Sequence, residues 1–231
     1  MGSRGTVRAG GWALIIGALA FMGVFAFLAA RFNYPEVLNG SADEVLPKLL
    51  ATGPSGRAAW AFYALLPLIW LPAGVGAYVA LRRLAPGAML LALQFAVISA
   101  ISMMLGLMRW PSMHWALAEA YVVADPAQRV VLSALFDGLN SYLGNYLGEF
   151  LGELSFSLFF LISALVMRKS PSAPRWASAI GLMTAVAGLI GMFRNMTSTV
   201  AMVAEINNYL LPAWMIIFGV VLLRLPAAAQ E

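Results

Sequence analysis

Six long runs of apolar residues, separated by short polar segments, divide the chain. A helix needs about 20 residues to cross the hydrocarbon core of a bilayer. The runs predict six transmembrane helices, at residues 11–30, 58–81, 87–108, 140–167, 176–193 and 209–224. The fold class that follows is all-α: a polytopic membrane helical bundle that forms a single domain over residues 1–231.

The composition supports a membrane protein. Hydrophobic residues make up 62% of the 231 residues and charged residues only 10%, with a mean hydropathy of +0.85. A soluble domain carries about 45–50% apolar and about 25% charged residues, so the charges here are too few to cover a water-facing surface. The lipid bilayer is therefore an expected partner. Basic residues lie at helix ends rather than in one patch, so we expect no nucleic-acid partner.

The chain has no cysteine and a single histidine, His114. Disulfides, thiolate chemistry and iron–sulfur clusters are therefore excluded, as is haem held by two histidines of one chain. We expect no cofactor and no metal site. Because His114 stands among Trp110, Trp115 and Tyr121, residue types that favour the membrane–water boundary, it is interpreted as an interfacial aromatic residue rather than a ligand.

The distribution of charge predicts the orientation of the spans. Eight basic residues and one acid, Glu231, lie at the ends that include the short turns 82–86 and 168–175. Six basic and nine acidic residues lie at the opposite ends. Lysine and arginine accumulate on the cytoplasmic side of membrane proteins. Both termini are therefore predicted to be cytoplasmic, and the acidic loops to lie outside.

Three arginines, Arg31, Arg109 and Arg194, mark the outer ends of the first, third and fifth spans. Each is followed by an acid-bearing loop and a returning helix with a basic inner end. This pattern is compatible with three related helical hairpins, because internal repeats are common in transporters. It is equally compatible with any up-and-down bundle, in which charges collect at helix ends.

The two longest loops contain apolar segments of their own. Residues 45–50 and 112–123 each predict a short helix lying at the membrane interface. Prolines at positions 67, 72 and 212 fall inside spans, where neighbouring helices can satisfy the freed carbonyl groups, and predict kinks there.

The fourth span contains the most polar stretch, residues 140–153. A stripe of small residues recurs every four positions and offers close contact to another helix, whether in this chain or in a partner protein: Gly144, Gly148 and Gly152. Beside it runs a polar stripe that drifts by about 40° per step on an ideal helix: Asn145, Glu149 and Glu153.

Counting 20 residues from an inner end near Met167 places Glu149 and Glu153 in the outer third of the hydrocarbon layer. An ionisable group at that depth faces the bundle interior or water and pairs with another group. The arginines at the outer helix ends are the natural partners. Three interpretations stay open: carboxylate–arginine pairs that fix helix register, a ligand-binding site, and catalytic or metal-assisted chemistry.

We expect an uncharacterised membrane protein with an outward-facing polar pocket that binds, senses or transports a small polar or amphiphilic molecule. The expected ligand-binding residues are Arg31, Arg109, Asn145, Glu149, Glu153 and Arg194. The alternatives are an intramembrane enzyme that uses Glu149 and Glu153, and an accessory subunit held by the glycine stripe. An enzyme is the weaker hypothesis, because the chain lacks a histidine cluster and a Gly-x-Ser-x-Gly motif.

Several segments of the third to fifth spans resemble a bacterial family of six-helix membrane proteins that is classed only as a domain of unknown function. They are Leu107-Met108-Arg109-Trp110-Pro111, Ala124-Asp125-Pro126, the stretch from Tyr142 to Gly152, and Pro174-Arg175-Trp176. The resemblance covers roughly residues 90–195 and implies a six-helix fold and a bacterial inner-membrane location. It implies no reaction.

Overall fold

The computed structural model describes residues 2–225, apart from the side chains of residues 38 and 39, and Glu231 lies outside this range. Every regular element in the described residues is helical. Six helical stretches among them are long and apolar enough to cross a membrane: Ser3–Phe32, Gly53–Leu81, Pro86–Val123, Pro126–Met167, Arg175–Asn195 and Ser198–Arg224. The prediction of an all-α bundle with six transmembrane helices is confirmed, and each stretch is longer than predicted.

The first span is α1 (Ser3–Phe32). The second consists of α3 (Gly53–Leu65), η2 (Leu66–Ile69) and α4 (Trp70–Leu81). The next two are α5 (Pro86–Met108), η3 (Trp110–His114) and α6 (Trp115–Val123), and then α7 (Pro126–Leu139), η4 (Asn140–Leu151) and α8 (Gly152–Met167). The last two are α9 (Arg175–Gly191) with η5 (Met192–Asn195), and η6 (Ser198–Val200) with α10 (Ala201–Arg224). The first long loop holds η1 (Glu36–Asn39) and α2 (Ala42–Ala51).

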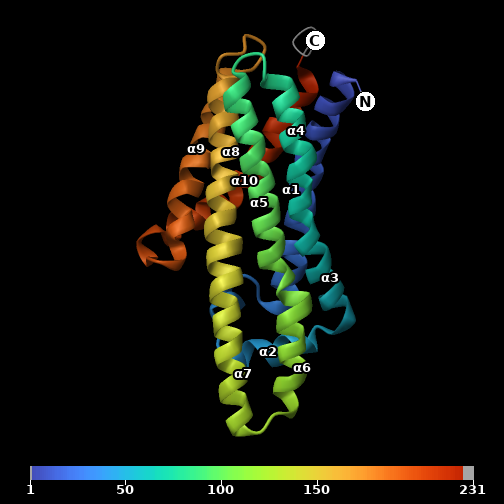
Figure 1. The fold of residues 1–231 in the computed structure, drawn as a ribbon, viewed down its shortest axis with the longest axis vertical. Coiled ribbons are helices and arrows are strands. Elements are labelled where there is room, and N and C mark those ends of the chain that lie inside the picture. The colour runs from blue at the N-terminus through green and yellow to red at the C-terminus, as the bar shows by residue number, and fades with distance from the viewer. Residues whose placement is uncertain (1, 226–231) are drawn as a thin grey trace.

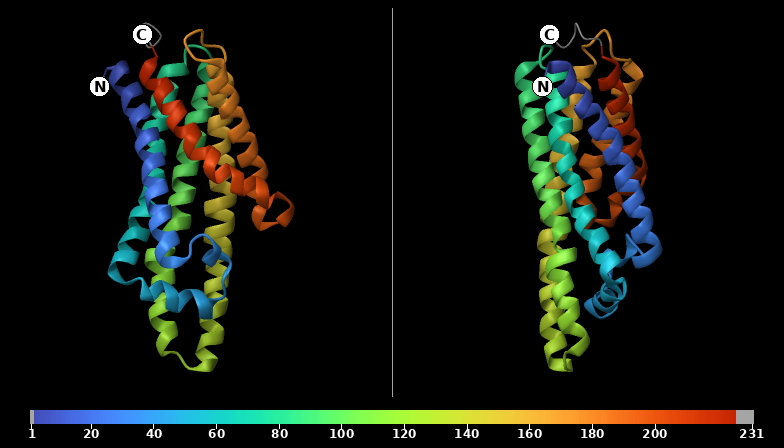
Figure 2. Two further views of the ribbon diagram at one scale, coloured as in Figure 1. Left: turned by 180° about the vertical axis from the view of Figure 1, so that it is seen from behind. Right: turned by 90° about the vertical axis from the view of Figure 1, so that its right-hand side faces the viewer.

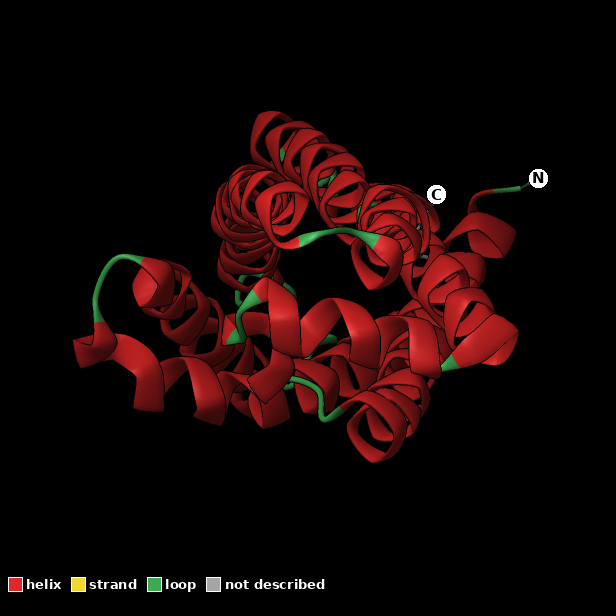
Figure 3. Ribbon diagram, turned by 90° about the horizontal axis from the view of Figure 1, so that it is seen from below, coloured by secondary structure: helices red, strands yellow, loops and turns green. Residues whose placement is uncertain are grey.

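The six spans form a ring in chain order, and α10 closes it by packing against α1 (Figures 1 and 3). Small residues permit this closeness. A Cβ on Gly10 of α1 would lie 2.7 Å from the Cα of Gly76 in α4, and one on Gly11 would lie 2.9 Å from the carbonyl oxygen of Gly219 in α10. Since lipid tails are as apolar as the helices, such backbone contact is a main source of helix association.

The glycine stripe of the fourth span makes the same kind of contact with α5 of its own chain. A Cβ on Gly148 would lie 3.0 Å from the Cα of Gly106, and one on Gly152 would lie 2.7 Å from Cγ of Met103. The close helix contact that the stripe predicts is therefore intramolecular.

The ring has two different ends. The beginning of α1, the end of α10 and the turns after α4 and α8 lie together at one end, called the terminal end below (Figures 1 and 2). At the opposite end, α6 and α7 project beyond all other helices, and this is called the hairpin end. The stretches Pro86–Val123 and Pro126–Met167 have 38 and 42 residues. At 1.5 Å per residue they are about 57 and 63 Å long, far more than a hydrocarbon core of about 30 Å.

The expectation of a separate interfacial helix at residues 112–123 is wrong. Pro111 cannot donate a backbone hydrogen bond, but the chain does not end its helix there. The N–H of His114 bonds to the carbonyl of Arg109 at 2.7 Å, a five-residue π-helical step. α6 therefore continues α5, in line, out of the membrane-spanning part.

The short helix predicted at residues 45–50 exists as part of α2. It lies across the projecting hairpin and packs against α6 and α7 (Figure 1). Its apolar side chains Val45, Leu46 and Leu49 are fully buried in a cluster with Trp115 and Phe136. A second core at the hairpin end thus adds to the main core between the spans.

Among the prolines, Pro67 lies in the 3₁₀ segment η2, which interrupts the second span. Pro212 lies inside α10, which continues through it as one helix.

Candidate functional site

Arg194 joins two carboxylates of the fourth span to the end of the fifth. It lies in η5, where the helix tightens after α9. Its Nη1 and Nη2 donate to Oε2 and Oε1 of Glu153 at 2.8 and 2.7 Å, and its Nε donates to Oε2 of Glu149 at 3.2 Å. Nδ2 of Asn195 donates to the same Glu149 oxygen at 2.7 Å. These four residues are called the Arg194 cluster below.

The Arg194 cluster lies at transmembrane depth and remains accessible. At 1.5 Å per residue, Glu153 and Glu149 stand about 21 and 27 Å along the helix from Met167, within a hydrocarbon core of about 30 Å. The side chains of Arg194, Glu149 and Glu153 nevertheless keep 28%, 25% and 22% of their surface exposed. Charged groups at such depth normally face the bundle interior or a water-filled space. The rest of the described chain therefore leaves part of this ion pair uncovered.

The two carboxylates are not equivalent. Both oxygens of Glu153 accept from the guanidinium of Arg194 in the parallel, two-pronged geometry that makes arginine–carboxylate pairs strong. Glu149 uses only Oε2, and no hydrogen bond to its Oε1 is found among the described residues. Glu149 therefore has an acceptor left for another donor.

Arg109 forms a second, more deeply buried cationic site. Only 4% of its surface is exposed. Its Nε and Nη2 donate to Oδ1 of Asn140 at 3.2 and 3.1 Å, and its Nη1 donates to the carbonyl of Gly106 at 2.5 Å. The guanidinium lies 5.1 Å from the ring centroid of Trp110. In the described part of the chain no carboxylate forms an ion pair with Arg109, although Glu149 is near enough to attract it electrostatically.

The structure brings Arg194, Glu149 and Glu153 together and leaves two other candidates apart. Arg31 is exposed at the end of α1 and takes part in none of the ion pairs among the described residues. Asn145 is half-buried, and its side chain makes no hydrogen bond with a described residue. The three arginines that look equivalent in the sequence thus have three different environments.

Two π-helical segments flank this region. They are η3, which follows Arg109, and η4, which contains Asn140, Asn145 and Glu149. Wider helical turns of this kind are rare and occur frequently at functional sites, because they redirect side chains away from the regular helical positions. Here η4 packs against α5, and η3 packs against α3.

His114 is not an interfacial aromatic residue exposed to the membrane boundary. It is fully buried, with ring centroids 4.7 Å from both Trp110 and Phe136. Within the described part of the chain, neither of its ring nitrogens has a hydrogen-bond partner, and the indole N–H groups of Trp60 and Trp110 also lack one. Trp60 and Trp110 stack at 4.8 Å. Burial at this position follows from the π-helical step, which no sequence periodicity reveals.

Tyr34 closes the hairpin-end side of this aromatic cluster. It stands in the loop after α1, and its ring contacts Trp60 and Tyr63. Burial raises the pKa of its hydroxyl above the ordinary tyrosine value, so the group stays protonated and is available as a donor at neutral pH.

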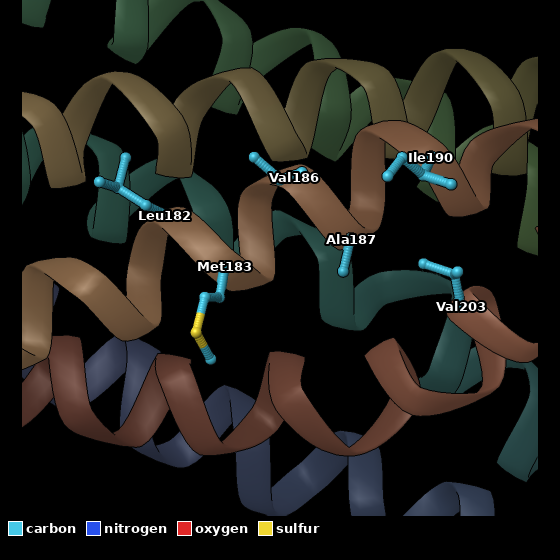
Figure 4. A pocket seen from close by; sticks show the side chains of 6 residues that line it. All are labelled: Leu182, Met183, Val186, Ala187, Ile190 and Val203. Atoms are coloured by element: carbon cyan, nitrogen blue, oxygen red, sulfur yellow. The ribbon is translucent and has the colours of Figure 1, made fainter.

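A shallow, open depression of about 410 Å³ lies between α9 and α10, and side chains from both helices line it (Figure 4). All its lining residues are apolar: Leu182, Met183, Val186, Ala187, Ile190 and Val203. It offers no polar group to a ligand and suits a lipid tail. Within residues 2–225, no group of three or more histidine, aspartate or glutamate side chains is placed to hold a metal ion.

Sequence reasoning missed Asn140 and Asn195 as members of these clusters. Asn195 directly follows Arg194 at the end of its helix, and Asn140 opens the polar stretch of the fourth span. Their proximity in the sequence to charged residues is the one feature that could have indicated these hydrogen bonds. An amide at a helix end more often serves as a cap.

The helical ring, the accessible ion pair at transmembrane depth and the projecting hairpin define a polytopic membrane protein. Over residues 5–225 the chain matches the family described as "Domain of unknown function (DUF4386)", and it belongs to that family. Neither a curated protein nor a solved structure matches it.

Proposed function

We propose that this membrane protein binds a small polar or amphiphilic molecule at the Arg194 cluster, as part of sensing or transport. The observation that carries the proposal is an ion pair at transmembrane depth that is about one-quarter exposed and has an unused acceptor, Oε1 of Glu149. A pair that served only to fix helix register gains nothing from exposure.

The charges indicate the kind of ligand. Glu149 pairs with Arg194 and is also attracted by Arg109, which directly follows α5. The weaker contact of Arg194 is the one to Glu149, at 3.2 Å. A ligand with a hydroxyl or ammonium donor could therefore bind Glu149 while the two-pronged pair with Glu153 stays intact. Arg31 and Asn145 lie outside the Arg194 cluster, and in this proposal they contact the ligand only if their side chains move toward it on binding.

For the location, we propose a bacterial inner membrane with both termini cytoplasmic. The basic turns at residues 82–86 and 168–175 support this orientation, since both lie at the terminal end. The Arg194 cluster would then open toward the outer leaflet.

Glu149→Gln tests the proposal, with Glu205→Gln as the matched control because Glu205 is exposed on α10. The measurement is native mass spectrometry of the purified protein, combined with its thermal unfolding. We expect a small molecule that co-purifies with the wild type and the control but is lost from Glu149→Gln. A lower melting temperature with identical bound masses in all three proteins would identify a structural ion pair and contradict the proposal.

A further inference from the structure

A second groove lies between α3 and the junction of α5 with η3, two helix interfaces along the ring from the α8–α9 pair that holds the Arg194 cluster. Its volume is about 390 Å³. The side chains that line it are mostly apolar and come from both sides: Pro54, Arg57, Ala58, Ala61, Met108, Pro111 and Ser112. Arg57 is the one charged residue in this lining.

Arg57 is held in a fixed position at the mouth of the groove. Its Nε donates to the carbonyl of Pro111 at 3.0 Å, and its guanidinium lies 5.2 Å from the ring centroid of Trp115. No carboxylate of the described chain pairs with it. The residue is exposed, so its two Nη atoms are available to an acceptor outside the protein.

The groove lies at the level of lipid headgroups. Measured along the helices from the terminal end at 1.5 Å per residue, Met108 stands about 33 Å from Pro86, and Arg57 about 37 Å from Arg82. The hydrocarbon core is about 30 Å thick and the whole bilayer about 40–45 Å. By the same count Ala61 stands about 31 Å from Arg82, at the boundary of the hydrocarbon core, while Ala58 and Arg57 fall in the headgroup layer.

We propose that this groove is a binding site for an anionic phospholipid of the leaflet at the hairpin end. Its phosphate would bind the Nη atoms of Arg57, and its glycerol backbone and the first part of an acyl chain would lie along Ala58, Ala61 and Met108. A guanidinium matches phosphate through two parallel hydrogen bonds. Free inorganic phosphate would leave the apolar lining unused, so a lipid accounts for both halves of the groove.

The position of Arg57 has a second consequence. Its side chain connects α3 to the π-helical segment from which the projecting hairpin continues. A bound lipid would therefore contact both sides of the junction between the ring and the hairpin. This site uses none of the residues of the Arg194 cluster, so either proposal can fail without the other.

Arg57→Gln tests the site, because it removes the charge and keeps a donor for the Pro111 carbonyl. Arg129→Gln is the matched control: Arg129 is also exposed and also lies 5.2 Å from an aromatic ring, that of Tyr121, but outside the groove. The measurement is native mass spectrometry of protein released from nanodiscs that contain equal amounts of phosphatidylglycerol and phosphatidylcholine.

The wild type and Arg129→Gln should retain one phosphatidylglycerol. Arg57→Gln should bind this lipid at least about tenfold more weakly, since a hydrogen bond to a charged group is lost. Ala58→Trp, a change at an exposed position, should reduce retention by filling the groove, and it serves as the test if Arg57→Gln does not fold. Added inorganic phosphate should not displace the lipid. Equal retention in Arg57→Gln and Arg129→Gln, or in Ala58→Trp and the wild type, would overturn the proposal.

Discussion

Glu153 accepts two hydrogen bonds from Arg194, at 2.7 and 2.8 Å, and thereby ties α8 to the end of α9. Glu149, one helical turn earlier, receives one hydrogen bond from the same side chain, at 3.2 Å. The Glu153 carboxylate uses both oxygens to connect α8 to the end of α9. The Glu149 carboxylate keeps one oxygen for another donor. The assignment of separate roles to the two glutamates rests on this difference.

Glu153→Gln should therefore reduce stability more than Glu149→Gln. The first change removes a two-pronged, charge-assisted contact, and we expect a loss of about 2 kcal/mol. The second removes the weaker contact, and a glutamine oxygen can still accept from Asn195, so we expect less than about 1 kcal/mol. Equilibrium unfolding in detergent measures both, and a larger loss for Glu149→Gln would contradict the division of roles.

The six spans were predictable because each hydrophobic run approaches or exceeds the about 20 residues that a bilayer requires. Their ends were not, since hydropathy does not separate a helix that stops at the membrane from one that continues. At Pro111 the sequence indicates a break, but a π-helical step carries the helix onward to α6. Beyond that step, side chains of α6 pack in one cluster with α2 and α7, and such long-range packing is not visible in local periodicity.

The helical rise alone predicts the depth of Glu149 and Glu153 along the fourth span. The choice of partner could not, because Arg31, Arg109 and Arg194 occupy similar places in the sequence. Arg194 takes both carboxylates because η5 brings it beside α8. Arg109 lies against Gly144, where a Cβ would collide with its guanidinium, and this contact directs it toward Asn140 instead.

The contact of Gly106 with Gly148 should be among the least tolerant in the ring. A Cβ on Gly106 would lie 2.5 Å from the Cα of Gly148, where only backbone could move. Gly106→Ala should cost about 2 kcal/mol or more, as overpacking typically costs 1–3 kcal/mol. Gly87→Ala on the same helix is the control, because open space surrounds Gly87. It should be neutral or stabilising by up to about 1 kcal/mol, and thermal unfolding of the two variants should separate them clearly.

His114→Phe should stabilise the protein. Both ring nitrogens of His114 are buried without partners, and a phenyl ring of similar shape would remove their desolvation cost of about 1 kcal/mol or more. The neighbouring rings of Trp110 and Phe136 would keep their contacts. A variant that melts at a lower temperature than the wild type would show that the imidazole binds a group that the aromatic cluster itself does not supply.

Asn140 and Asn145 allow a matched test of the buried Arg109 site, because both are half-buried amides of η4. Asn140 accepts from two nitrogens of Arg109, whereas Asn145 makes no side-chain hydrogen bond with a described residue. Among residues 2–225, Asn140→Leu leaves the buried guanidinium with the Gly106 carbonyl as its remaining hydrogen-bond acceptor. We expect it to lose about 2 kcal/mol of unfolding free energy, near the upper end for interhelical polar contacts in membranes.

Asn145→Leu should lose almost none, since a leucine suits the same half-apolar surroundings. Unfolding of both variants in the same detergent is the measurement, and equal losses would mean that Arg109 finds its support elsewhere.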